Sequence, residues 1–260
     1  MKRVGGFAWT VTFFGLLCML TPLVVVIASS FNAGVEVAFP PKGFSFKWYA
    51  NVFARERFLK SFQFSFLLAS ASTAISLVLG LLSATAIVRH RFFGRDVAST
   101  ALSSPLMAPQ VVLGMSLLIF LSQAGIVSSV IGLGALHLIL TLPYTVRVLT
   151  ATLHRFPVSL EEAAIIHGAP RVVAFTLITV PVIKPGIVAA AIFAFVTSFD
   201  NFTASQFLIW DRTTLPVEIF AYATTESDPT VAAISAILVC VTAFVVVLVE
   251  RWVGLETVTG

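Results

Sequence analysis

Ionisable side chains are scarce in the apolar stretches of this sequence: Asp200 is the clear acidic case, and His137 is the other titratable group within a span. Groups of these types could attract a cation, relay a proton or act as general acid and base. The nearest histidines to His137 are not at the spacing of helical metal ligands, and neither residue forms a catalytic arrangement with a nucleophile. We therefore expect no catalytic residue, no metal site and no cofactor in this chain.

Asp200 and Asn201 stand in a polar patch with Ser198 and Thr203 near the end of an apolar segment. A charge at such a place is costly unless it faces water or the interior of a helix bundle. Two interpretations remain open: Asp200 and Asn201 line a polar path that attracts a cationic or polar solute, or Asp200 only pairs with a neighbouring helix. For His137, a hydrogen bond between helices is a better explanation than contact with a ligand.

The elements that carry these residues are expected to be membrane spans. Of the 260 residues, 58% are hydrophobic and 11% are charged, whereas soluble domains are about 25% charged. An apolar block of roughly 18 residues or more is long enough to cross the hydrocarbon layer as a helix. Six blocks meet this description: 7–30, 62–88, 97–121, 126–149, 185–206 and 231–249. We expect an all-α membrane protein with six transmembrane helices, in which residues 1–260 form a single domain with core helices over about 58–252.

The basic residues predict how the spans are oriented. With both termini in the cytoplasm, Arg89, Arg91 and Arg95 fall together in one inside loop. The connection over about 154–184 is then also inside, and the outside connection over 207–230 has a single Lys or Arg. This distribution follows the positive-inside rule. We expect a multi-pass protein of the cell inner membrane with both termini cytoplasmic.

The inside connection over 154–184 is too long and too well punctuated to be a plain linker. Ser159 followed three residues later by Glu162 has the pattern of a capping box, which starts a helix. The pattern predicts a short helix from Leu160 to about His167.

A second short helix is expected to follow a sharp turn. Gly168 suits the left-handed conformation that ends a helix, and Pro170 suits the first turn of another. The second helix should run from Arg171 to about Thr179 and end at Pro181. We therefore expect a cytoplasmic helix-turn-helix between the fourth and fifth spans.

The same connection places six residues at the spacing of a known motif: Glu162, Ala163, Ala164, Gly168, Ile178 and Pro181. This is the pattern of the EAA loop, with Val180 where leucine is usual. The chain thus resembles the EAA-loop permeases, the inner-membrane subunits of binding-protein-dependent ABC importers, and in particular the spermidine/putrescine type. Further cues for that type are Phe46-Lys47-Trp48-Tyr49, Leu142-Pro143-Tyr144, Ser198-Phe199-Asp200, Leu215-Pro216 and Asp228-Pro229.

The resemblance implies a function and a set of partners. In such importers the EAA loop is a coupling helix that docks on the ATPase, so Leu160 to Arg171 would transmit ATP-driven movement to the spans. The implied partners are two ATPase subunits inside, a periplasmic or lipid-anchored substrate-binding protein outside, and a second permease, commonly a different chain. The implied cargo is a small solute such as spermidine or putrescine, or another small organic solute or a metal complex. Glu162 would either contact the ATPase or only cap its own helix.

The sequence contains no phosphate-binding Gly-x-x-x-x-Gly-Lys-Ser/Thr loop. We therefore expect ATP hydrolysis on a separate chain and no enzymatic activity in this one. The alternatives are a secondary transporter or channel, against which the EAA-like loop argues, and a membrane scaffold that binds another cytoplasmic protein. Pro105, Pro109 and Pro143 interrupt backbone hydrogen bonding in the third and fourth spans, either as hinges or as static kinks.

Overall fold

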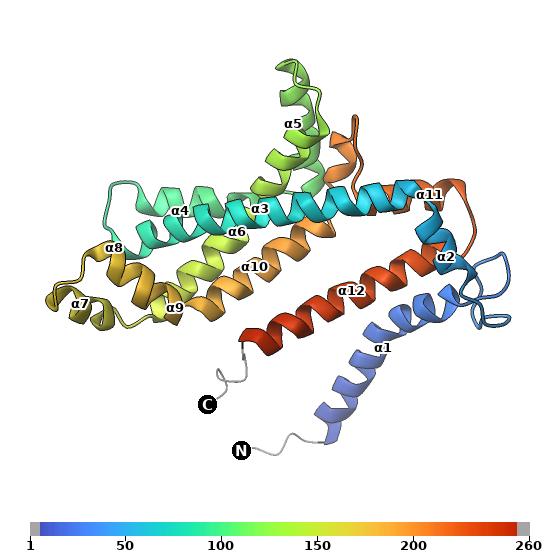
Figure 1. Ribbon diagram of the computed structural model, residues 1–260, viewed down its shortest axis with the longest axis horizontal. Helices are drawn as coiled ribbons and strands as arrows, with labels where there is room; N and C mark the ends of the chain where they lie inside the picture. The colour runs from blue at the N-terminus through green and yellow to red at the C-terminus, as the bar shows by residue number, and fades with distance from the viewer. Residues whose placement is uncertain (1–5, 254–260) are drawn as a thin grey trace. The chain divides into compact units, whose positions relative to one another are not determined.

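The structure, a computed structural model, describes residues 6–253. Within these residues the chain is helical apart from turns and one isolated bridge between Asn32 and Phe44. The described residues divide into two compact units, one formed by residues up to 60 with 218–245, and the other by 61–217 with the remainder. The elements, most of them labelled in Figure 1, are α1 (Gly6–Ser30), α2 (Lys47–Ala54), α3 (Glu56–Arg89), α4 (Arg95–Ser103), η1 (Ser104–Met107), α5 (Gln110–Gln123), α6 (Ser129–Arg155), α7 (Ser159–Ile166), α8 (Arg171–Ala174), the π-helical η2 (Phe175–Thr179), α9 (Val180–Val182), α10 (Lys184–Phe199), η3 (Ser205–Leu208), α11 (Leu215–Thr225) and α12 (Thr230–Val253).

In the first unit, side-chain hydrogen bonds join the short helix α2 to its neighbours. Trp48 Nε1 donates to the carbonyl of Asn32 at 2.8 Å, which ties α2 to the loop after α1. Asn51 Nδ2 donates to Thr230 Oγ1 at 2.9 Å, which ties α2 to the start of α12. By contrast, α1 is exposed from Trp9 to Val24, and only its end, at Ser29 and Ser30, is buried. Most of α1 therefore does not pack within its own unit.

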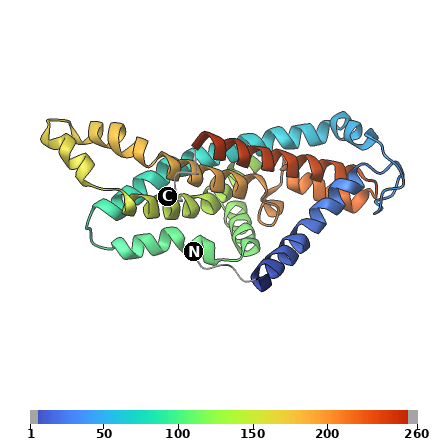
Figure 2. The same ribbon diagram turned by 90° about the horizontal axis from the view of Figure 1, so that it is seen from below.

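In the second unit, α6 forms the centre of the packing. One apolar cluster includes Leu133, Leu136 and Leu140 of α6, and a second includes Leu149 and Leu153 of the same helix. α10 lies alongside α6 in both views (Figures 1 and 2). Because one helix supplies residues to both clusters, movement of α6 is coupled to most of this unit.

The contact between α6 and α10 depends on a missing side chain. Gly186, in the first turn of α10, faces Thr152 of α6 so closely that a methyl group at position 186 would collide with the Thr152 hydroxyl. Small residues at helix contacts in membranes let the two backbones approach, which strengthens van der Waals packing. Gly186 is therefore a packing residue.

The apolar helices agree with the expected membrane spans only in part. The helices α1, α3 and α6 are each long and apolar enough to cross a membrane, and two further pairs qualify if each bent pair is one span. The expected continuous span over 97–121 is instead bent by 103° between Met107 and Gln110. The cause lies in Pro109, which has no N–H and restricts the preceding residue, so that Ala108 takes an extended conformation. Pro143 lies inside α6 without ending it.

The second bent pair consists of the helical segment before α10 and α10 itself. Residues Arg171–Val182 and Lys184–Phe199 meet at an angle of 71°. The expected span over 185–206 therefore ends earlier, at Phe199, and the chain continues as a turn and the short helix η3. The described apolar part of α12, Thr230–Phe244, is shorter than the other spans.

Candidate functional site

The helix α7 carries the first part of the EAA pattern, and its start differs from expectation. The capping box predicted from Ser159 and Glu162 is wrong: Val158 is the residue before the helix, and no side chain caps it. Val158 already has helical backbone angles, so its carbonyl accepts the N–H groups of Glu161 and Glu162. The interpretation of Glu162 as a cap is thereby excluded, and its side chain is exposed.

The end of α7 is as predicted. Gly168 has φ +92°, in the left-handed region that favours glycine. The Gly168 N–H donates to Ile165 O at 2.9 Å and the Ala169 N–H to Ala164 O at 3.0 Å. These two bonds form a Schellman motif, which satisfies carbonyls at the helix end. The predicted sharp turn after α7 therefore exists.

The second arm of the hairpin runs further than predicted. It does not end at Pro181 but continues to Val182, through α8, the π-helical turn η2 and α9. In a regular α-helix the ring of Pro181 would clash with the carbonyl four residues earlier. The wider turn, closed by a bond from Val180 N–H to Phe175 O, comes directly before the proline and accommodates it. Such π-helical turns occur often at functional sites.

The six EAA residues differ in their surroundings. Glu162, Ala163, Gly168 and Pro181 are exposed, whereas Ala164 is half-buried. Ile178 is also half-buried and packs against the cluster around Leu149 and Leu153. The hairpin is thus attached to the core of the unit through Ile178. The outer surface of α7 also exposes apolar side chains, with Leu160 45% and Ile166 83% exposed.

One residue of α7 that the sequence did not single out, Glu161, contacts two other segments through its carboxylate. Glu161 Oε2 lies 3.0 Å from Arg89 Nη2, at the end of α3, and accepts a hydrogen bond of 2.7 Å from Thr179 Oγ1. The predicted site residue Glu162 is exposed, whereas its neighbour Glu161 is part of this cluster. No spacing rule connects Arg89 with Glu161, since they lie on different helices far apart in the sequence.

The second predicted site lies at the end of α10, where Asp200 and Asn201 have different environments. Asp200 follows the last helical residue and is exposed, and no residue that the structure describes pairs with its carboxylate. Asn201 is buried, and its Oδ1 accepts from the N–H groups of Ala204 and Ser205. Its Nδ2 donates to Gln110 Oε1 at 2.9 Å. The interruption after α10 thus meets the interruption before α5.

His137 is enclosed by the same network. Ser205 Oγ donates to Asn201 Oδ1 at 2.9 Å, so it must accept the N–H of His137 Nε2, 3.1 Å away. In the neutral imidazole the other nitrogen, Nδ1, then accepts the hydroxyl proton of Ser198 at 2.6 Å. Both ring nitrogens are satisfied, as expected for a hydrogen bond between helices. Among the described residues no three His, Cys, Asp or Glu side chains are grouped as metal ligands.

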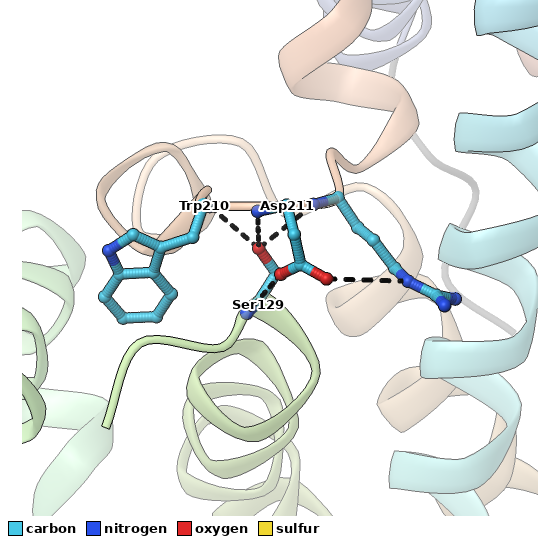
Figure 3. Close-up of polar contacts among 4 residues, drawn as sticks. Ser129, Trp210 and Asp211 are labelled. Atoms are coloured by element: carbon cyan, nitrogen blue, oxygen red, sulfur yellow. Dashed lines mark hydrogen bonds and ion pairs between the residues drawn. The ribbon is translucent and has the colours of Figure 1, made fainter. Parts of the chain in front are cut away.

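A third polar contact, shown in Figure 3, closes the loop before α11 on the start of α6. Ser129 Oγ accepts the consecutive N–H groups of Trp210, Asp211 and Arg212 at 2.8, 3.1 and 3.2 Å. In return, Asp211 Oδ1 accepts the Ser129 N–H at 2.9 Å, and so caps α6 from another part of the chain. This N–H lowers the pKa of the exposed Asp211 carboxyl, with a smaller contribution from the Arg212 guanidinium. The sequence showed no sign of this contact.

Two named permeases resemble the chain in sequence. The spermidine/putrescine transport system permease protein PotC of Haemophilus influenzae is 28% identical over 228 residues, which cover 87% of this chain and 88% of that protein. The putrescine transport system permease protein PotI of Escherichia coli K12 is 27% identical over 232 residues, which cover 86% of this chain and 82% of that protein.

Solved structures show the same fold. A crystal structure of a bacterial ABC transporter involved in the import of the acidic polysaccharide alginate matches with a TM-score of 0.72 at 16% identity, covering 96% of this chain and 93% of that one. The expected all-helical fold class is thereby confirmed. The model of one family, described as binding-protein-dependent transport system inner membrane component, matches residues 76–254. Since that is more than half of the chain and includes α6, the EAA hairpin and the polar network around Asn201, the chain belongs to this family.

Proposed function

We propose that this chain forms half of the translocation path of an ABC importer for a polyamine such as spermidine or putrescine. As a member of its family it is a multi-pass inner-membrane permease subunit and not an enzyme. The polyamine cargo is supported by the two relatives named above, with which the chain aligns over most of its length. Another small organic solute or a metal complex is the alternative. The alternative of a secondary transporter or channel has no support in these relatives.

The proposed subunit has six spans and one permease domain. The spans are α1, α3, the bent pair of α4 and α5, α6, the bent pair that ends in α10, and α12. Residues 1–260 would act as a single domain, with core helices over about 58–252 and a coupling loop over about 154–184. Both termini would be cytoplasmic, although residues 1–5 and 254–260 lie outside the described residues.

The observation that carries the proposal is the exposed helix α7. It projects Glu162 and Ala163 together with the apolar side chains of Leu160 and Ile166, both of which are exposed. Exposed apolar side chains beside a charge mark a surface for another protein. We propose that α7 and its turn at Gly168 dock into an ATPase subunit, of which the complete importer has two copies. The small side chain of Ala163 lets a partner approach closely.

The end of α10 supports a substrate path. Interrupted helices that meet near the middle of a membrane are typical of transporter binding sites, because the interruption frees polar groups for the cargo. Here the two interruptions are joined through Asn201 and Gln110, and they adjoin the carboxylate of Asp200, which pairs with none of the described residues. We propose that Asp200 attracts the cationic cargo and that Asn201 holds the turn that presents it.

Two further partners complete the proposed importer. A second permease, a different chain, would supply the other half of the path, and the uncovered surface of α1 gives it a place to pack. A periplasmic or lipid-anchored binding protein would deliver the cargo from outside. The outer connection over 207–230, of which the Ser129 contact holds Trp210, Asp211 and Arg212 to α6, would then face that binding protein.

The test is uptake of labelled putrescine and spermidine into vesicles that contain the chain with its ATPase, second permease and binding protein. Gly168→Pro should abolish ATP-dependent uptake and release the ATPase from the membrane, because proline cannot adopt φ +92°. Gly125→Pro is the matched control, since Gly125 has φ +71° and the same two hydrogen bonds at the end of α5. Loss of ATPase retention in both variants, or in neither, would refute the docking role of α7.

The role of Asp200 is tested in the same vesicles. Asp200→Asn removes the charge and should lower uptake of polyamines, while Asp200→Glu keeps the charge and should retain it. Equal uptake by the wild type and Asp200→Asn would remove Asp200 from the path. Uptake without ATP in the wild type would refute the importer itself.

A further inference from the structure

The last residue of α3 and a residue of α7 form an ion pair that is largely removed from solvent. Arg89 Nη2 lies 3.0 Å from Glu161 Oε2, and the side chains are 15% and 16% exposed. By comparison, the pair of Glu56 and Lys60 at the start of α3 is 78% and 72% exposed. Exposed pairs contribute little, whereas breaking a buried pair leaves an uncompensated charge. The arrangement of Arg89 thus depends on Glu161.

Further contacts make this pair a junction of four segments. The Arg89 guanidinium lies over the ring of Phe156, at the end of α6, with 5.2 Å to the ring centroid. Glu161 Oε2 accepts from Thr179 Oγ1, whose side chain is fully buried in the π-helical turn η2. The pair therefore joins the ends of α3 and α6 to both arms of the EAA hairpin.

Among the described residues, Arg89 has no second carboxylate with which it could replace Glu161. Its Nε and Nη2 groups are buried without a hydrogen-bond acceptor, and the contact of Nη2 with Glu161 is an ion pair that lacks hydrogen-bond alignment. In residues 6–253, Glu161 supplies the only carboxylate within ion-pair distance of Arg89. A shift of α7 would therefore draw Arg89, and with it the end of α3, rather than exchange one partner for another.

We infer that the Arg89–Glu161 pair is the positioning link through which movement of the coupling hairpin reaches α3. The inference rests on the proposed function and adds two residues outside the EAA pattern to it. The two neighbouring glutamates then have different roles: Glu162 contacts the ATPase, and Glu161 contacts the subunit's own spans. Loss of Glu161 should then uncouple ATP hydrolysis from transport, whereas loss of Glu162 should weaken ATPase retention.

The experiment uses the complete importer in vesicles and measures three quantities: ATPase retained on the membrane, ATP hydrolysed, and labelled putrescine taken up per ATP. Glu161→Gln and Arg89→Gln should each retain the ATPase while uptake per ATP falls by about tenfold. Glu56→Gln, which removes the exposed pair at the other end of α3, should leave all three quantities unchanged. Glu162→Gln should lower retention without lowering uptake per ATP hydrolysed.

The double variant Arg89→Gln/Glu161→Gln separates linkage from simple stabilisation. It removes both charges, so it should regain the thermal stability that each single variant loses. If the pair is the link, the double variant stays uncoupled in spite of its regained stability. If uptake per ATP returns to the wild-type value together with stability, the pair is only structural and the inference is overturned.

If the Gln variants of Arg89 and Glu161 do not reach the membrane in useful amounts, a milder variant tests the role of the ion pair. Glu161→Asp keeps the charge but withdraws it by one methylene, and should lower uptake per ATP while the ATPase is retained. Unchanged uptake per ATP in Glu161→Asp would contradict the inference. A wild-type complex that neither retains the ATPase nor transports with ATP would instead refute the proposed function, and this result is visible before any variant is compared.

Discussion

Replacing Ser129 with alanine should loosen the start of α6. The Ser129 hydroxyl oxygen accepts three N–H groups, and a methyl group accepts none. A hydrogen bond contributes about 1 kcal/mol net to stability. Three donors share one oxygen here, and the neighbouring Asp211 and Arg212 are open to water, so the loss should be about 1–3 kcal/mol. The bond from the Ser129 N–H to Asp211 uses the backbone and remains.

The purified chain is heated in detergent, and the fraction of protein that stays monodisperse is measured at each temperature. A loss of about 1 kcal/mol lowers the midpoint by about 2–4 °C in a protein of this size. Ser128→Ala is the control, because Ser128 directly precedes α6 and its side chain makes no capping bond. If Ser129→Ala and Ser128→Ala have the same midpoint, the hydroxyl does not hold the loop, and the reasoning fails.

Three further results are expected in the same assay. The Ser129 N–H lowers the folded-state pKa of Asp211, so the carboxylate stabilises the fold at neutral pH and loses this effect as the pH falls through the lowered pKa. Acid should therefore lower the melting midpoint more in the wild type than in Asp211→Asn. Parallel pH profiles of the two midpoints would contradict this. His137→Leu removes the side-chain partner of the buried Ser198 hydroxyl and one of the two side-chain bonds of Ser205, which keeps its bond to Asn201, and should cost about 1–3 kcal/mol, so an unchanged midpoint would show that the network adds no stability. Gly186→Ala should cost about 1–3 kcal/mol by overpacking, and adding Thr152→Ala should recover part of it, because it removes two of the three colliding atoms and keeps the Cβ; no recovery would place the strain elsewhere.

Sequence reasoning succeeded where a signal was local. The left-handed turn at Gly168 depends on one residue without a side chain, and it was predicted correctly. The capping-box residues are present, but the box does not form. The carbonyls of Pro157 and Val158 already accept the first N–H groups of α7, which the Ser159 side chain would otherwise accept. A local pattern predicts what a segment can form, and the preceding residues decide whether it does.

The features that the sequence did not predict depend on contacts between segments that are distant in the sequence. The two prolines around position 107 indicated a disturbance in the third span but not its angle of 103°. The partnership of Arg89 with Glu161 and that of Asn201 with Gln110 need the helices to be placed before they can be recognised. Polar residues on different helices are free to pair in many ways, and only packing selects one.

The bend between Met107 and Gln110 has a consequence for the solvent around it. Helix ends leave peptide groups without an intrahelical partner, and in hydrocarbon each such group costs several kcal/mol. Met107 and Pro109 are exposed on this chain. Acyl chains cannot solvate this stretch, so where it lies at membrane depth it must border a hydrated cavity or a neighbouring subunit. At that depth the bend would mark a side of the permease that lipid does not wet, with its peptide groups hydrated from an aqueous cavity or covered by the neighbouring subunit.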